Sequence, residues 1–530
     1  MRHTAVATLL LAGTTLVIAA VARSVPGHLT ENNLIHSAPA ASAQSGLEQS
    51  GTPKKDNPSI VDPLQVKPGS TVEIGTRPLA HPKNIEIDLD RTEKVAIPRV
   101  SADLQPAAFK TSDGHDGWVM RLPGSRPVAT PAYADGLLFV GGGYGSHEFY
   151  AFQADTGKLV WKISTRDDGP TAAVVEGGYV AFNTESCTVV VLEEKTGKVV
   201  WQEWLGDPLM SQPAIADGRL FMAYPAGGRK GSQDGHRLLA ADLKTGKHLW
   251  VQDITGDVIS APVVSDGVVY VTCFDGTSFA MHASDGKVLW RKAQAATSAP
   301  LVAGGDVVVT LREQNGASVN EGLARLDVAK GDQRDKELLA KDKAAYLAPG
   351  NSGGMALDAT AQKMLDSSVG FSNAPAAAKL KAAENNVGVN NVVGAWAYQG
   401  SRAAYSEGQM LNAQGHMLNS VRAADGTMTW RAEAKSVQIN DHMQVFSPPA
   451  IGGRYMYLTS SLGHILAVRR KDGGVQFAYS LGTPMNFQPA LARGNIYAGT
   501  TQGLLICLKT GNNDADGWYE WGGNAQHNKK

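Results

Sequence analysis

One phrase recurs along the chain: Ala154-Asp-Thr-Gly-Lys-Leu-Val-Trp161, then Glu194-Lys-Thr-Gly-Lys-Val-Val-Trp201, then Leu243-Lys-Thr-Gly-Lys-His-Leu-Trp250. Shorter copies end at Trp290 and Trp430, and a weaker copy ends at Phe477. Thr-Gly and Asp-Gly are typical of tight hairpin turns, which need positive φ. The apolar residues after each turn predict a strand, and its aromatic end is expected to pack between neighbouring repeats.

A second phrase opens each repeat and combines Pro, small residues and often Asp-Gly. Its eight copies, two of them degenerate, start at Thr130, Thr171, Gln212, Ala261, Ala299, Trp396, Pro448 and Gln488. Two alternating apolar runs lie between a start and an end, so each repeat of about 40 residues predicts a four-stranded antiparallel sheet, the size of a propeller blade. We therefore predict an all-β fold, an eight-bladed β-propeller over residues 113–530.

The two ends of the repeat region bear on how the ring closes. Gly117–Leu122 resembles the fourth strand of a repeat but precedes the first repeat start. Trp518–Trp521 is a second candidate for the strand that completes the last blade. We expect the N-terminal strand to complete the last blade, with the C-terminal segment covering the seam. Residues 336–390 interrupt the regular spacing of the repeats and predict a partly helical insertion. It is either a solvated surface segment or a lid over one mouth of the channel.

The chain before the repeats divides into two parts. Residues 1–22 combine a basic start with the uncharged run Ala5–Ala22, which predicts a cleaved signal peptide or an uncleaved N-terminal anchor. Residues 23–112 predict a linker or extension, partly disordered, in which Asn84–Leu89 alternates and is expected to add a strand outside the propeller. We therefore expect an exported protein, periplasmic or extracellular.

Charge and cysteine content exclude some functions. The formal net charge is -1, so there is no basic excess to hold nucleic acid. The three cysteines, Cys187, Cys273 and Cys507, lie far apart and form no Cys-x-x-Cys motif, which excludes covalent haem and a zinc knuckle. Buried free thiols are the favoured interpretation, with one disulfide as the alternative.

The repeat phrases closely resemble those of the PQQ-like, quinoprotein-type β-propeller family, over about residues 113–521. This resemblance implies the propeller fold but leaves the activity open, because the family includes PQQ-dependent dehydrogenases and BamB-type outer-membrane assembly lipoproteins. The chain has neither the adjacent cysteines typical of the former nor the N-terminal lipidated cysteine of the latter.

Polar residues stand at or just before several repeat starts and are candidates for a ligand site in the central channel. They are Gln212, Ser260, Asn440, Asp441, His442, Gln444 and Gln488. Equivalent positions of a propeller are related by rotation about its axis, so we expect these side chains to converge near one mouth. The alternative is that they only satisfy strand ends and channel water.

Asn183 and Glu185 stand where other repeats have a Gly-containing turn. In the dehydrogenases of the resembling family a Glu and an Asn help to bind calcium beside the quinone, so these two residues are metal-ligand candidates; a structural turn is the alternative. No catalytic residue can be named. The leading hypothesis is a non-enzymatic binding or scaffold module for a protein or another cell-envelope ligand, with no cofactor required. The alternative is an oxidoreductase that uses PQQ or a metal such as calcium on a small molecule in the channel.

Overall fold

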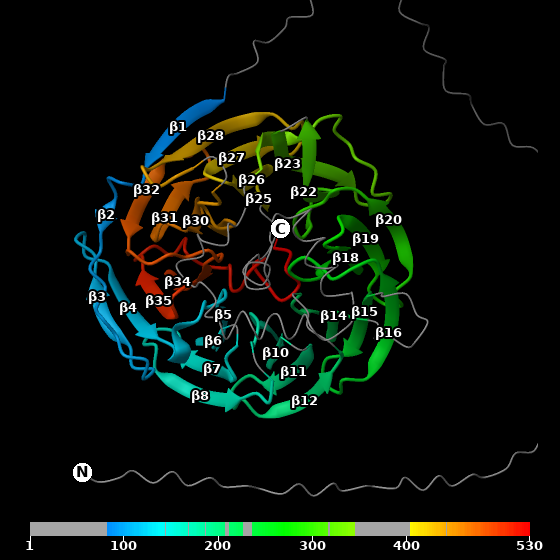
Figure 1. The fold of residues 1–530 in the computed structure, drawn as a ribbon, viewed down its shortest axis with the longest axis horizontal. Coiled ribbons are helices and arrows are strands. Elements are labelled where there is room, and N and C mark those ends of the chain that lie inside the picture. Colours follow the sequence, from blue (N-terminus) through cyan, green and yellow to red (C-terminus); the bar gives the residue numbers. More distant parts are fainter. Residues whose placement is uncertain are drawn as a thin grey trace, which may run out of the picture. The chain divides into compact units, whose positions relative to one another are not determined.

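The computed structural model describes residues 82–529 except 144, 168, 186, 207–210, 226–235, 316–317, 345–402 and 441–442. Eight sheets are arranged around a central axis, each built on four antiparallel strands, with the short strand at the repeat start innermost (Figure 1). The predicted eight-bladed β-propeller is therefore confirmed. Within the described residues the only helix is one 3-10 turn, Pro123–Ser125, and no helix is long and apolar enough to span a membrane.

Blades 1 to 4 each consist of four consecutive strands. Blade 1 has β5 (Ala132–Ala134), β6 (Leu137–Gly141), β7 (Glu148–Gln153) and β8 (Leu159–Ser164). Blade 2 has β9 (Val174–Glu176), β10 (Tyr179–Asn183), β11 (Thr188–Glu193) and β12 (Val199–Trp204). Blade 3 has β13 (Ala214–Ala216), β14 (Arg219–Pro225), β15 (His236–Asp242) and β16 (His248–Ile254). Blade 4 has β17 (Val263–Ser265), β18 (Val268–Thr272), β19 (Thr277–His282) and β20 (Val288–Ala293).

Blades 5 to 7 follow the same order. Blade 5 has β21 (Leu301–Ala303), β22 (Asp306–Asn315), β23 (Ser318–Asp327) and β24 (Leu339–Lys343). Blade 6 has β25 (Ala403–Ser406), β26 (Gln409–Gln414), β27 (Met417–Arg422) and β28 (Met428–Lys435). Blade 7 has β29 (Ala450–Gly452), β30 (Tyr455–Thr459), β31 (His464–Arg469) and β32 (Val475–Ser480). Strand β24 lies inside the range predicted as a partly helical insertion, 336–390, and residues 345–390 of that range lie outside the described residues.

Blade 8 joins the two ends of the repeat region. Its inner strands are β33 (Ala490–Ala492), β34 (Asn495–Gly499) and β35 (Leu504–Lys509), and its fourth strand is β4 (Asp116–Arg121), which pairs antiparallel with β35. The predicted closure by the N-terminal strand is confirmed. Closure through backbone hydrogen bonds leaves no open seam in the ring.

Three short N-terminal strands cover the outer edges of three blades. Strand β1 (Lys83–Asp88) adds parallel to β28, β2 (Glu93–Lys94) adds parallel to β32, and β3 (Ala107–Lys110) adds antiparallel to β4. The predicted outer strand at Asn84–Leu89 therefore exists over Lys83–Asp88. Its Ile87 is buried against blade 6 because alternate residues of a strand face the same side.

The repeated tryptophans join each blade to the next. Their indole N–H groups donate to the backbone carbonyl three residues before the turn glycine of the following blade: Trp118 to Ala154, Trp161 to Glu194, Trp201 to Leu243, Trp250 to Ala283, Trp290 to Val328 and Trp430 to Arg470. A Cβ at Gly246 would lie 2.9 Å from the Trp201 ring, and Gly246 has φ +71. This turn therefore needs glycine both for its backbone conformation and for the close approach of the indole.

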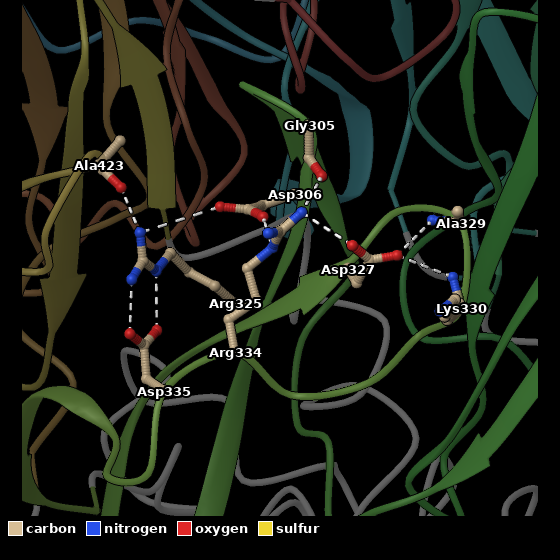
Figure 2. A network of polar contacts seen from close by, with 9 residues as sticks. All are labelled: Gly305, Asp306, Arg325, Asp327, Ala329, Lys330, Arg334, Asp335 and Ala423. Atoms are coloured by element: carbon tan, nitrogen blue, oxygen red, sulfur yellow. Dashed lines mark hydrogen bonds and ion pairs between the residues drawn. The ribbon is translucent and has the colours of Figure 1, made fainter. Parts of the chain in front are cut away.

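Blades 5 and 6 are joined by a different contact. Leu339 takes the tryptophan position against Gly426, and the equivalent carbonyl, that of Ala423, accepts a hydrogen bond from Arg325 (Figure 2). Arg325 is held by two hydrogen bonds to Asp335, of 2.7 and 2.5 Å. Its side chain is 10% exposed, so a buried ion pair replaces the indole at this seam.

All three cysteines are buried and free, which confirms the interpretation as free thiols. Burial raises the pKa of Cys273 to about 12, because the thiolate would lose its hydration. These residues belong to the blade cores.

Candidate functional site: the central channel

The C-terminal tail, residues 514–529, runs inside the ring along the innermost strands, and the C-terminus lies near the axis (Figure 1). This corrects the expectation that the segment covers the seam of blade 8. An innermost strand is a sheet edge, and its inward N–H groups need partners. The tail supplies them.

Six inner strands bind the tail through the same position, their middle N–H group. Within the described part of the chain, the donors and acceptors are Leu491 to Trp518 O, Tyr133 to Tyr519 O, Val175 to the Glu520 carboxyl, Ile215 to Ala525 O, Val264 to Gln526 O and Val302 to Asn528 Oδ1. These strands belong to blades 8, 1, 2, 3, 4 and 5 in turn. The tail therefore binds around most of the ring.

Trp521 occupies the centre of this arrangement. Its side chain is buried against one residue from each of five blades, 1, 2, 4, 5 and 8. In that order they are Ala129, Ala172, Ala261, Ala299 and Phe487. The indole stacks on the His527 imidazole, with ring centroids 3.8 Å apart and an interplanar angle of 8°. The two rings form a compact aromatic plug inside the channel.

Two buried titratable groups of the tail have strongly shifted pKa values. Burial raises the pKa of Glu520 well above its usual range, and nearby Glu176 adds to this effect. Burial lowers the pKa of His527 to about 4, although its ring nitrogens lie 2.9 Å from the carbonyl oxygens of Trp521 and Pro213. His527 is therefore neutral in the docked tail near neutral pH, and burial favours the protonated form of Glu520.

Two of the predicted channel residues contact the tail directly. The Gln212 side chain accepts a 2.6 Å hydrogen bond from the Trp521 indole. The Gln488 side chain accepts one of 2.9 Å from the Gly522 N–H and donates to Pro449 O. Ser260 lies beside them, since its carbonyl accepts a 2.6 Å hydrogen bond from the Gln212 N–H. The structure thus brings these three residues together around the tail.

The other channel candidates lie elsewhere or outside the described residues. Asn440 is exposed in the segment that follows β28. Gln444 accepts from the Gly415 N–H and donates to the Phe446 carbonyl, and so orders the chain between blades 6 and 7. Asp441 and His442 lie outside the described residues.

The metal-ligand candidates have separate structural roles. Asn183 is fully buried; its Oδ1 accepts a hydrogen bond from Thr171, and its Nδ2 donates to the Ser211 carbonyl. Glu185 accepts a 2.5 Å hydrogen bond from the Gly145 N–H in the loop of blade 1. Across the described ranges, no group of three or more His, Cys, Asp or Glu residues could hold a metal ion.

The centre of the channel, as the structure describes it, does not fit a planar quinone. Trp521 and His527 take the space on the axis, and Gln212 and Gln488 bind the tail. A cofactor such as PQQ would therefore have to displace the tail before it could bind there.

Two surface pockets lie outside the channel, at the seam between blades 5 and 6. One, of about 490 Å³, is lined by charged residues that include Asp342, His416, Arg431 and Glu433. The other, of about 450 Å³, lies between Asp306 and Met410. Both are next to the ends of residues 345–402, which lie outside the described residues.

Sequence reasoning missed the role of Trp521 and His527 because the tail belongs to no repeat. The Trp518–Trp521 segment was weighed only as a closing strand or as a seam cover. The available signal was the segment 510–530 after β35: its 21 residues are too few for another blade, yet they include Trp518, Tyr519 and Trp521.

Comparison with known proteins supports the same fold. A family model described as outer membrane protein assembly factor BamB matches residues 105–228, 185–348 and 372–526. The quinoprotein alcohol dehydrogenase PedH of Pseudomonas putida is 30% identical over 113 residues, which is 19% of this chain and 19% of that protein. The match thus spans about a fifth of that relative, and it leaves PQQ possible.

Two solved structures are similar to the chain at low sequence identity. BamB from Moraxella catarrhalis has 11% sequence identity and a TM-score of 0.48, over 76% of this chain and 98% of that one. The quinohemoprotein alcohol dehydrogenase from Comamonas testosteroni has 13% identity and a TM-score of 0.49, over 75% and 76% of the two chains.

Proposed function

Since the chain belongs to the PQQ-like propeller family described as outer membrane protein assembly factor BamB, we propose that it is an exported module that binds a partner polypeptide in the cell envelope. The observation that carries this proposal is the filled channel. In a propeller enzyme the channel would have to admit substrate and cofactor, whereas here it holds the chain's own tail. The uncharged run Ala5–Ala22 supports export.

The outer rim is the surface proposed for the partner. The chain itself adds strands to the outer edges of blades 6, 7 and 8. In blade 6 this addition occurs even though the pairing of β27 with β28 carries a bulge. The same irregularity occurs in blades 1 to 4, so it is no obstacle to strand addition there.

Among the residues that the structure describes, no strand covers the outer edges of blades 1 to 4, and these edges expose apolar side chains. Most of the large exposed hydrophobic residues that the structure describes lie on these edges: Leu159, Val160, Val199, Trp204, Leu249, Val251 and Leu289. Trp204 is 66% exposed. The edge of blade 5 carries Lys341 and Lys343 and none of these exposed hydrophobic residues, whereas the edges of blades 1 and 4 combine such residues with Lys162 and Lys292.

In blades 1 to 3 the repeated tryptophan is less buried than under a covering strand. Trp430 lies under β1 and is 1% exposed, whereas Trp161, Trp201 and Trp250 on uncovered edges are only partly buried. Trp290 in blade 4 differs, since it is 6% exposed without a covering strand. An added strand with aliphatic residues at alternate positions, as at Ile85 and Ile87, would complete the burial of these rings. The proposed partner is therefore an extended polypeptide segment with alternating aliphatic residues.

The test uses a peptide that copies residues 83–95 of the chain and carries a photo-crosslinking group. We expect crosslinks to β8, β12, β16 or β20 of the full chain. The double variant Leu249→Lys and Val251→Lys should lose the crosslinks to blade 3, because buried lysines oppose strand addition. Val437→Lys is the matched control, since Val437 is an exposed hydrophobic residue away from the open edges.

The crosslink positions decide between the outcomes. Crosslinks only to β28 would mean that the peptide exchanges with β1 and does not add to open edges, which contradicts the proposal. Absence of any crosslink would contradict it as well. Quinone absorbance after addition of PQQ and calcium, with dye reduction by alcohols, would favour an oxidoreductase instead.

A further inference from the structure

We propose that the central channel is a binding site for a short polypeptide with a Trp-Gly-Gly core, and that the C-terminal tail is its ligand in cis. This site is distinct from the outer rim and does not depend on the function proposed for it. The argument rests on three features: a ring of backbone donors, a pocket that selects tryptophan, and a ring closure that does not use the tail.

The ring of donors gives the channel a general affinity for polypeptide. The middle N–H groups of six inner strands point at tail acceptors, and five of these acceptors are carbonyl or amide oxygens. Four of them are main-chain carbonyls, in the consecutive pairs 518–519 and 525–526, and every polypeptide carries such groups. Backbone hydrogen bonds of this kind provide affinity, and side-chain pockets provide specificity.

The pocket for Trp521 gives the channel its specificity. Four alanines from separate blades leave room for one large aromatic ring, and Gln212 accepts a hydrogen bond from the indole nitrogen. Phe or Tyr would not supply that donor at the same place. A buried tryptophan with its N–H satisfied is a typical anchor of a peptide in a groove.

The residues after the tryptophan must be glycine. Gly522 has φ +74, and a Cβ there would lie 2.6 Å from the Cα of His527. Gly523 has φ +95, and a Cβ there would lie 2.3 Å from the Cβ of Lys529. The two glycines form the turn that brings His527 back onto Trp521, so the ligand is defined as Trp-Gly-Gly followed by a returning His.

The tail is separable from the ring by its connectivity. Strand β4 closes blade 8 through β35, so the sheet of every blade is complete without residues after Lys509. The docked tail also leaves polar atoms buried without partners among the described residues, including Glu520 Oε2, Trp518 Nε1 and Asn528 Nδ2. Such atoms weaken docking, because they lose water and gain nothing in return.

The experiment uses the full chain and a fluorescent peptide of residues 517–530. The wild-type chain should not bind the peptide, because its own tail is present at a high effective concentration. The full-length Trp521→Ala variant has a weakened cis tail and should bind the wild-type peptide. A peptide with Trp521→Ala should bind that variant at least tenfold more weakly, whereas a peptide with Gln526→Ala should bind equally well, since Gln526 contacts Val264 through its backbone carbonyl.

Hydrogen exchange of the wild-type chain gives an independent test that needs no variant. If the tail is a ligand, the N–H groups of Tyr133, Ile215, Val264, Val302 and Leu491 should exchange together in one opening event that leaves the blade interiors protected. Exchange of these five only with global unfolding would show that the tail is part of the folded core and would overturn the proposal. A folded Trp521→Ala chain that does not bind the peptide would overturn it too.

Discussion

The buried carboxyl and imidazole of the tail predict opposite pH dependences for docking, and two single variants separate them. His527 has a pKa of about 4 when docked, against about 6.5 for a released tail. Docking therefore disfavours protonation of His527. The free energy of docking becomes less favourable as the pH falls below 6.5 toward 4. Between pH 7 and pH 5 this amounts to about 2 kcal/mol, or about 25-fold in the opening equilibrium.

Glu520 acts in the opposite sense. Its pKa is raised in the docked tail, so docking favours the protonated carboxyl and strengthens as the pH falls. In the wild-type chain the two contributions offset each other. In Glu520→Gln only the His527 contribution remains, and docking should weaken by about 25-fold from pH 7 to pH 5. In His527→Gln docking should strengthen over the same interval.

The assay is hydrogen exchange at the Ile215 and Val264 N–H groups, which donate to the tail at Ala525 and Gln526. Protection is compared at pH 5 and pH 7 after correction for the intrinsic exchange rate at each pH. Melting of the whole ring is followed in parallel and should change much less than tail protection. If the protection in Glu520→Gln changes by less than threefold between pH 5 and pH 7, the reasoning is refuted. The same holds if protection changes with pH in the same direction in Glu520→Gln and His527→Gln.

Three further predictions concern the ring. Trp430→Ala should lower the free energy of unfolding by about 4 kcal/mol and Trp201→Ala by about 2 kcal/mol, because only Trp430 is fully buried; urea titration of both variants measures the difference. Asp335→Ala should cost about 3 kcal/mol in the same titration, since it leaves buried Arg325 with only the more distant carboxylate of Asp306, 4.0 Å away; a loss below 1 kcal/mol would contradict that role. The Cys273 thiol should resist alkylation by iodoacetamide at pH 8 until the chain unfolds, because it is buried and its pKa is raised to about 12; rapid labelling of the folded chain at Cys273, found by mass spectrometry, would argue against it.

The repeat phrases alone were enough to predict the blades and their number. Turn glycines, alternating apolar residues and a terminal tryptophan are local signals, and each recurs at nearly the same spacing. The closing strand Asp116–Arg121 was also predictable, since a strand without a repeat needs a partner and the last repeat lacked one. The outer strand at Lys83–Asp88 followed from its alternation.

Among the channel residues, Gln212, Ser260 and Gln488 were predictable because they stand at equivalent or neighbouring places in their repeats and the ring makes such places converge. What they bind was not predictable. Trp521, His527 and the two glycines belong to no repeat, and their contacts are with strands that lie hundreds of residues away in the chain. The sequence by itself determined the ring, because its signals are local and periodic. The tertiary structure alone decided what fills the channel, because the ring must first close before its inner N–H groups face one axis and can be matched by a single tail.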